Sequence, residues 1–173
     1  MAKLTLHDVD LKGKTVLMRV DFNVPIKEGV ISDDNRIVQA LKSINFVIDA
    51  GAKLILTSHL GRPGGSPDPE FSLKPVADHL ATLVDVPVHF ATDCIGDTRK
   101  EVVDQAKPGE IVLLENVRFH AGEKANDSDF TKQLSEGADL FVNDAFGSSH
   151  RAHASVAGVT EFLQPSVSGF LLE

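Results

Sequence analysis

The sequence predicts an α/β fold: a parallel sheet flanked by helices on both faces, in a three-layer, Rossmann-like arrangement. Short apolar runs rich in β-branched residues alternate along the chain with longer segments of helical period. Parallel strands cannot be joined by tight hairpins, whereas a helical crossover can join them. The alternation therefore favours a sheet whose helices return the chain from the end of one strand to the start of the next.

Five segments are predicted as strands. They are the short apolar runs at residues 15–20, 53–57, 86–90, 110–114 and 139–142. Compact domains usually run to about 100 to 200 residues. We therefore expect residues 1–173 to form a single domain.

The clearest predicted helix lies between the first two strands. Its apolar positions recur at helical spacing, in Ile37, Leu41, Ile44 and Ile48. Possible caps and a stop signal flank it, in Ser32, Asp33, Asp34 and Gly51. Two more helices are predicted after Ser72 and after the capping cluster 126–128, a weaker helical pattern covers 97–106, and the Gly/Pro-rich stretch 61–69 is predicted as a loop.

Composition is that of a folded, water-soluble domain, with 42% hydrophobic and 24% charged residues. The formal net charge is −8, so the chain has no overall positive field of the kind that attracts nucleic acid or an anionic membrane. We expect neither as a partner. Any anion that the chain binds must meet a local group of cations.

The single cysteine, Cys94, excludes an internal disulfide and a multi-cysteine metal site. Two interpretations of Cys94 remain: a partly buried residue without a chemical role, and a lone reactive thiol. The first is favoured.

No stretch approaches the roughly 20 apolar residues that span a bilayer, and the first residues lack the apolar core of an export signal. These features predict a reducing, cytoplasmic setting. The largely apolar run 167–173 at the end suggests a chain cut from a longer protein.

Ligands of open α/β sheets bind outside the carboxyl ends of the strands, so the residues after each predicted strand are the candidates for a site. Polar and cationic residues follow four of the five strands, and only the third strand ends without them. These residues are Asp21, Asn23 and Arg36; His59 and Arg62; Arg118; and Arg151.

Four arginines at one edge of an acidic protein indicate a small anion with more than one charge. Taken singly, each is expected to be a solvated or salt-bridged surface residue, but four at one edge repel one another unless an anion neutralises them. Arginine suits this role because its planar guanidinium grips a carboxylate or phosphate with two parallel donors.

Asp21 and Asn23 alternate along an extended segment and so face the same way, which suits a sugar-like hydroxyl. The alternative is turn chemistry before Pro25. His59 could donate to a phosphate, although a lone histidine is more often structural. His150 and His153 have the spacing of a metal pair but no third ligand, so we expect no metal site.

The usual sequence signs of a nucleotide site are missing. The chain has no Gly-x-x-x-x-Gly-Lys-Ser/Thr phosphate loop, no Gly-x-Gly-x-x-Gly after a strand, and no serine nucleophile elbow. If the chain takes part in catalysis, it is equipped for electrostatic positioning.

At these motifs the sequence resembles the phosphoglycerate kinase family. The matching segments are VLMRVDFNVP at 16–25, TSHLGRP at 57–63, LENVRF at 114–119, NDAFG at 143–147 and SHRAH at 149–153. The resemblance covers the whole chain in order, but only the N-terminal lobe of a two-lobe kinase. It implies that the C-terminal lobe, which holds Mg-ADP or Mg-ATP, is absent, and that no cofactor binds to residues 1–173.

The resemblance also implies a role for each candidate residue. Asp21 and Asn23 would contact the hydroxyl region of 3-phosphoglycerate or 1,3-bisphosphoglycerate, and Arg36 would be the catalytic arginine beside the carboxylate. The residues implied around the phosphate that is not transferred are His59, Arg62, Arg118 and Arg151.

Three functional interpretations follow. The parent protein is expected to be a glycolytic phosphotransferase and a monomer, while residues 1–173 alone would bind substrate without turning it over. The alternatives are a stand-alone, non-catalytic domain that binds small anions, and an unrelated nucleotide-binding α/β protein. The missing phosphate loop argues against the last.

Overall fold

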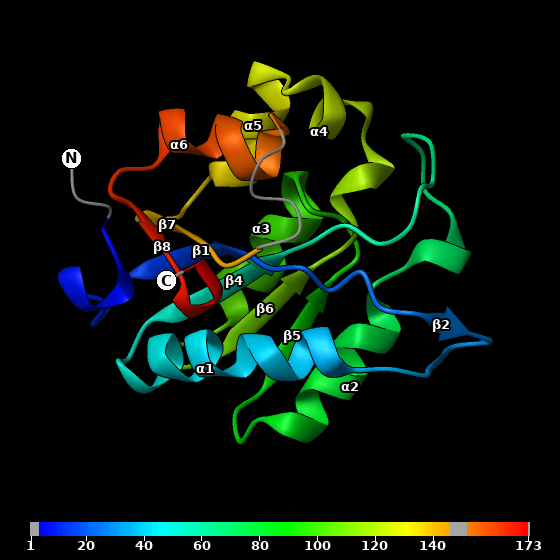
Figure 1. Cartoon of the computed structure of the whole chain (residues 1–173). Helices are drawn as coiled ribbons and strands as arrows, with labels where there is room; N and C mark the ends of the chain where they lie inside the picture. Colours follow the sequence, from blue (N-terminus) through cyan, green and yellow to red (C-terminus); the bar gives the residue numbers. More distant parts are fainter. Residues whose placement is uncertain (1–3, 146–151, 173) are drawn as a thin grey trace.

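The computed structural model describes residues 4–145 and 152–172, and the chain forms the predicted parallel α/β sandwich (Figure 1). Its sheet has the strand order β5-β6-β4-β1-β7-β8, and all five pairings are parallel. The strands are β1 (Thr15–Arg19), β4 (Lys53–Thr57), β5 (Val88–Ala91), β6 (Ile111–Leu114), β7 (Leu140–Asn143) and β8 (Ser166–Ser168). The five predicted strands are therefore present, each within two residues of its expected bounds.

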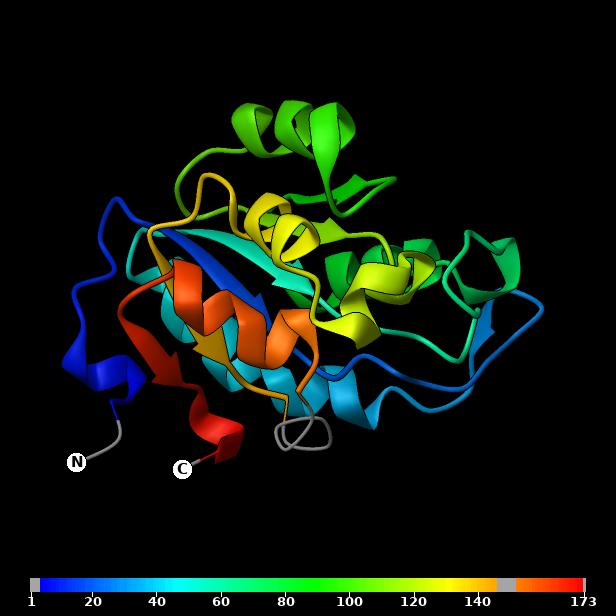
Figure 2. The same ribbon diagram turned by 90° about the horizontal axis from the view of Figure 1, so that it is seen from above.

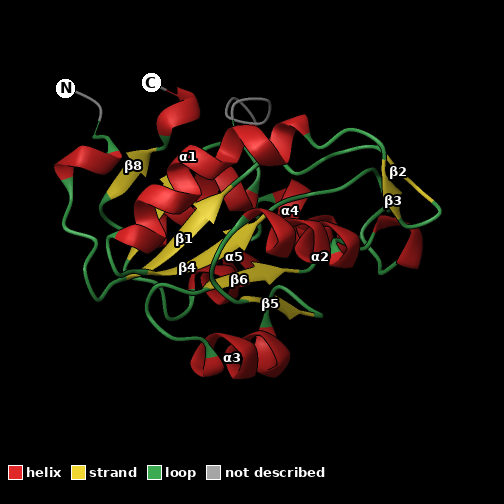
Figure 3. Cartoon of the chain, turned by 90° about the horizontal axis from the view of Figure 1, so that it is seen from below, coloured by secondary structure: helices red, strands yellow, loops and turns green. Residues whose placement is uncertain are grey.

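Helices cover both faces of the sheet, as Figures 2 and 3 show from above and below. The helices are α1 (Asn35–Asp49), α2 (Lys74–Leu83), α3 (Gly96–Gln105), α4 (Ala121–Ala125), α5 (Ser128–Ser135) and α6 (Val159–Phe162). On one face Met18 and Leu56 pack with Ile44 of α1 and Val76 of α2. On the other face, the neighbouring strand residues pack with α3, α5 and α6, through Leu17, Ile55, Val103, Leu134 and Val159. This division follows from the two-residue period of a strand.

The predicted helix starts are present, but their caps differ in detail. Asp34 occupies the N-cap position of α1, yet its carboxylate bonds to Nε2 of His79 at 2.8 Å, and Asp33 accepts the N–H of Asn35 instead. Asp127 caps α5 by accepting the N–H of Phe130 at 2.9 Å. The capping signals therefore predict where these helices begin, although one of the two aspartates is used to join α1 to α2.

Some short elements were not predicted. The sixth strand, β8, lies at the sheet edge beside β7, and β2 (Ile26–Lys27) pairs with β3 (Val30–Ile31) in a small antiparallel hairpin that projects from the body (Figure 1). The structure also has short turns of helix at Leu6–Asp8, Pro69–Phe71, Val117–Phe119, Ala154–Gly158 and Phe170–Leu172. No helix in the described part of the chain has the length and apolar character needed to cross a bilayer.

Candidate functional site

The predicted site loops follow four strands that are direct neighbours in the sheet. In the order β6-β4-β1-β7, the chain leaves each strand at the same edge, because all of them run parallel. Arg118 follows β6, His59 and Arg62 follow β4, and Asp21 follows β1. Arg151 follows β7 in sequence but lies outside the described residues. The described candidate residues therefore follow central strands at one edge of the sheet, as expected for ligand sites of open α/β sheets.

Arg36 is held in place by the segment that follows β1. Its Nη1 lies 3.1 Å from Oδ1 and 3.2 Å from Oδ2 of Asp21, and 3.0 Å from the backbone oxygen of Asn23. Arg36 lies in the first turn of α1, where the helix dipole disfavours a cation and favours an anion. About half of its side chain remains exposed. The guanidinium is therefore anchored on one side and open to an anion on the other.

Gly61 links the Asn23 side chain to Arg118. The Oδ1 of Asn23 accepts the N–H of Gly61 at 2.9 Å, and the carbonyl oxygen of Gly61 accepts a bond from Nη1 of Arg118 at 3.1 Å. Gly61 has φ +62°, and a Cβ at this position would lie 2.4 Å from the ring of Phe71. A glycine is required here because any side chain would be both strained and obstructed.

The structure shows the turn contact of the Asp21 and Asn23 pair, together with contacts to two other segments. Oδ1 of Asp21 accepts the N–H of Asn23 at 3.2 Å, which is the turn chemistry expected before Pro25. The same carboxylate holds Arg36, and the Asn23 amide reaches the loop after β4. The two side chains are therefore bound into the edge of the site rather than into an isolated turn.

His59 is buried, and its neighbour Arg19 fixes its tautomer. Nη2 of Arg19 lies 2.7 Å from Nδ1 of His59. Because a guanidinium can only donate, Nδ1 is the acceptor and the hydrogen of the neutral ring lies on Nε2. His59 can therefore donate from Nε2, as a phosphate ligand would require.

Arg19 belongs to a buried polar network that the sequence analysis did not find. Its Nε donates to Oγ of Ser155 at 2.9 Å, and Ser155 in turn donates its N–H and its hydroxyl to the carboxylate of Glu123, at 2.8 and 2.5 Å. All three side chains are buried. The network joins β1 to α4, through Glu123, and to the Ala154–Gly158 turn, through Ser155.

Glu115 and Asn116 support the loops from beneath, and sequence reasoning assigned them no role. Glu115 accepts three hydrogen bonds, from Ser72, Leu73 and the N–H of Asn116. The Nδ2 of Asn116 donates to the carbonyl oxygens of Leu60, at 2.7 Å, and Phe71, at 3.0 Å. The signal available in the sequence was their position within the largely apolar segment 111–119, because a polar group in a buried segment must be hydrogen-bonded.

Arg62 differs from the other cations of the edge. It is exposed, and its guanidinium makes no hydrogen bond or ion pair with any residue that the structure describes. Beside Arg118, a cavity of about 260 Å³ is lined by Gly64, Gly65, Arg118, His120, Ala121 and Lys124. Among the described candidate residues, Arg118 is the one that lines this cavity, where Lys124 is a second cation.

The fold and this edge define a class: a parallel α/β domain whose central strand ends are followed by loops with arginine and histidine donors. The chain belongs to the phosphoglycerate kinase family, because the sequence profile of that family matches residues 6–173. A phosphoglycerate kinase of Akkermansia muciniphila is 58% identical over 173 residues, which is 100% of this chain and 43% of that protein. One from Fervidobacterium nodosum is 53% identical over the same coverage.

Solved structures agree with this family membership. The phosphoglycerate kinase from Coxiella burnetii matches 99% of this chain with a TM-score of 0.85 and 38% identity, and the chain covers 42% of it. The enzyme from Pyrococcus horikoshii gives a TM-score of 0.88, 34% identity and 98% coverage of this chain, against 43% of its own. The chain thus spans less than half the length of the relatives it matches.

Proposed function

We propose that residues 1–173 form the substrate-binding lobe of a phosphoglycerate kinase and hold 3-phosphoglycerate or 1,3-bisphosphoglycerate. One observation carries this proposal: a continuous hydrogen-bonded path runs from Arg36 through Asn23 and Gly61 to Arg118. It fixes two guanidinium groups relative to each other across neighbouring strand ends. A ligand with an anionic group at each end would be gripped by both.

The two ends of the ligand would meet different residues. Arg36 would face the carboxylate, and Asp21 and Asn23 would lie near the hydroxyl. The phosphate that is not transferred would be surrounded by the donors His59, Arg62, Arg118 and Arg151.

The reaction proposed for the parent enzyme is reversible transfer of a phosphoryl group from the acyl phosphate of 1,3-bisphosphoglycerate to ADP. In the reverse direction the attacking group is a carboxylate, which is already ionised at pH 7 and needs no general base. Phosphoryl transfer depends mainly on in-line positioning and on cations that stabilise the charge of the moving group. Arg36 is the described residue suited to that task, because it is anchored but half exposed.

The rest of the proposal concerns the parts of the enzyme that lie beyond this chain. A second lobe would hold Mg-ADP or Mg-ATP and close over the strand ends, which would exclude water. Residues 1–173 alone would then be a single domain that binds substrate without turnover. A monomeric enzyme of cytoplasmic glycolysis fits this picture.

Two titrations and one assay test the proposal on the 173-residue chain. Calorimetry should detect binding of 3-phosphoglycerate but not of MgATP, and no ATP should form from 1,3-bisphosphoglycerate and ADP. Arg62→Ala and Arg118→Ala should each weaken 3-phosphoglycerate binding roughly tenfold or more, since a hydrogen bond to a charged group contributes about 1.5 to 3 kcal/mol. Lys74→Ala removes an exposed charge away from these loops and serves as the control.

Equal binding of sulfate and 3-phosphoglycerate would instead support a general anion-binding domain. For the catalytic role, Arg36→Ala in an enzyme that carries both lobes should lower turnover about 10³-fold, as removal of an arginine that stabilises phosphoryl transfer does elsewhere. Turnover within a fewfold of normal would remove Arg36 from that role.

A further inference from the structure

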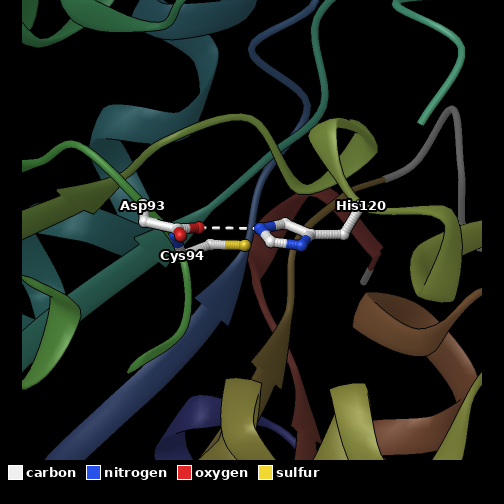
Figure 4. A group of neighbouring side chains, drawn as sticks. All are labelled: Asp93, Cys94 and His120. Carbon is white, nitrogen blue, oxygen red and sulfur yellow. Dashed lines mark hydrogen bonds and ion pairs between the residues drawn. The ribbon is translucent and has the colours of Figure 1, made fainter. Parts of the chain in front are cut away.

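Three side chains with metal-ligating atoms meet beside the Val117–Phe119 turn. Asp93 and Cys94 follow the edge strand β5, and His120 lies between the Val117–Phe119 turn and α4. The ligand atoms of the three residues all lie within 4.8 Å of one another. Figure 4 shows the Asp93 carboxylate and the Cys94 sulfur both directed at the His120 ring. In the sequence, no cationic candidate follows this strand. In the described part of the fold, the loop after it supplies two of the three residues in this group of metal-ligating atoms.

We propose that Asp93, Cys94 and His120 form a binding site for a divalent cation of the zinc class. Thiolate sulfur, imidazole nitrogen and carboxylate oxygen are the three donor types that zinc accepts, and a set that mixes them disfavours the hard, all-oxygen cations magnesium and calcium. Two of the ligands are adjacent in sequence and the third comes from a separate loop. Such spacing escapes a search for histidine pairs or cysteine motifs.

The present hydrogen bonds leave the Asp93 carboxylate and the His120 ring accessible to a metal. Oδ1 of Asp93 accepts from the N–H of Cys94 at 2.7 Å and pairs with Nε2 of His120 at 2.7 Å. No donor in the described ranges engages Oδ2 of Asp93, and 43% of this side chain is exposed. A cation can therefore take Oδ2 while Oδ1 keeps its backbone bond, and it needs only to replace the hydrogen between Nε2 and the carboxylate.

A fourth coordination position would open toward solvent. Asp93 and His120 line a cavity of about 510 Å³, whose other walls are Pro67, Asp68, Pro69, Ser72, Thr92, Glu115 and Phe119. Cys94 is fully buried behind them. The cation would thus sit at the inner wall of the cavity, with a water molecule as its fourth ligand and two further carboxylates, Asp68 and Glu115, facing the same space.

The charges around the three residues include two carboxylates. Asp93 and Glu123 place negative charge near Cys94, and Arg99 places an opposing positive charge there. The same carboxylates attract a divalent ion. Binding would break the S–H bond and form a sulfur–metal bond, with the proton released to solvent. On His120 the Nε2 hydrogen would move to Nδ1, leaving the Nε2 lone pair for the metal.

A bound cation would link the loop after β5, which carries Asp93 and Cys94, to His120 just before α4. The pair His120 and Asp93 already links these segments, so the metal would tighten an existing contact. We therefore expect binding to stabilise the folded chain by mass action, because no such site exists in the unfolded chain.

Cobalt is the probe that tests the proposal, since tetrahedral cobalt with a thiolate ligand absorbs in a characteristic way. Metal-free 173-residue chain is titrated with Co²⁺, and then with Zn²⁺ to displace it. We expect one equivalent of Co²⁺ to give a thiolate charge-transfer band together with tetrahedral ligand-field bands, and Zn²⁺ to remove them and raise the unfolding temperature.

Each ligand variant has a distinct expected result. Cys94→Ser should lose the charge-transfer band, and His120→Gln and Asp93→Asn should each weaken Co²⁺ binding at least about tenfold. His79→Gln, which breaks a comparable histidine–aspartate pair elsewhere, should leave binding unchanged. If Cys94→Ser does not fold, the proposal is tested by His120→Gln and Asp93→Asn, which change partly exposed side chains. Absence of the band in the unsubstituted chain, or unchanged affinity in both His120→Gln and Asp93→Asn, would overturn the proposal.

Discussion

Nη2 of Arg19 lies 2.7 Å from Nδ1 of His59, so a fully buried arginine sets which nitrogen of a site histidine carries the hydrogen. The arrangement makes Arg19 a positioning residue for the proposed phosphate site. It also means that the site extends below the loops to the last residue of β1.

Arg19→Met should therefore change His59 as well as stability. The ring loses the donor to Nδ1 and is expected to populate both neutral tautomers, which nitrogen chemical shifts of the ring report. Binding of 3-phosphoglycerate should weaken about twofold if the two tautomers are equally populated, since only the tautomer with a hydrogen on Nε2 can donate. Arg99→Met removes another buried arginine, which donates to the backbone oxygen of Leu134. It should lower stability while leaving the ring and the affinity as they are; an unchanged tautomer in Arg19→Met would contradict this account.

Gly61 and Gly64 separate backbone strain from steric obstruction. Both have positive φ, +62° and +77°, but a Cβ on Gly61 meets the Phe71 ring at 2.4 Å, whereas one on Gly64 has nothing within 4 Å. Gly64→Ala should cost about 1 kcal/mol from backbone strain alone, and Gly61→Ala about 2 to 4 kcal/mol. Urea unfolding measures both. Adding Phe71→Ala should relieve part of the strain in the Gly61→Ala chain, and equal costs for the two glycines would contradict the steric argument.

In the metal-free folded chain, Cys94 should react very slowly with thiol reagents. Burial raises the pKa of its thiol, and so do the charges of Asp93 and Glu123, so little thiolate exists near neutral pH. A thiol-specific disulfide reagent is expected to react only as fast as the chain unfolds, and rapidly in urea. Fast labelling of native protein at pH 7, with folding intact by circular dichroism, would be incompatible with the buried thiol.

Glu110 should contribute stability that depends on pH. The hydrogen bond from His89, followed by that from the N–H of Lys107, lowers the pKa of its carboxyl below the ordinary value near 4. A depressed pKa in the folded state stabilises the protein above the unfolded value, and this stability is lost as pH falls through the folded value. The stability difference between the unsubstituted chain and Glu110→Gln should hence be present at pH 6 and shrink below about pH 4. A difference independent of pH would contradict the pairing.

Much of the fold could be predicted because its signals are local. Five strands and the starts of α1, α2 and α5 follow from apolar runs and capping residues within each segment. The short strand Ser166–Ser168 could not be predicted, because two of its three residues are serines and only its pairing with β7 makes it a strand. The hairpin strands, of two residues each, are likewise defined by each other.

The sequence predicted the loop residues of the candidate site but not the buried residues that support them. The rule that ligands bind at strand ends found the residues on the loops, since each follows its strand directly in sequence. Arg19 was missed because an arginine inside a strand is expected to face solvent, and its burial depends on Ser155 and Glu123, which come from distant segments. Asp93 and Cys94 could not be recognised as possible metal ligands from the sequence, because the third ligand, His120, is close to them only in the fold.

The most direct test of the substrate-lobe proposal is a crystal structure of this chain with 3-phosphoglycerate. The account predicts the phosphate among Arg62, Arg118 and Nε2 of His59, the hydroxyl near Asp21 and Asn23, and the carboxylate toward Arg36. A ligand bound in the reverse orientation would contradict the roles assigned to the arginines. A ligand bound away from the ends of β1, β4 and β6 would contradict the proposed function itself.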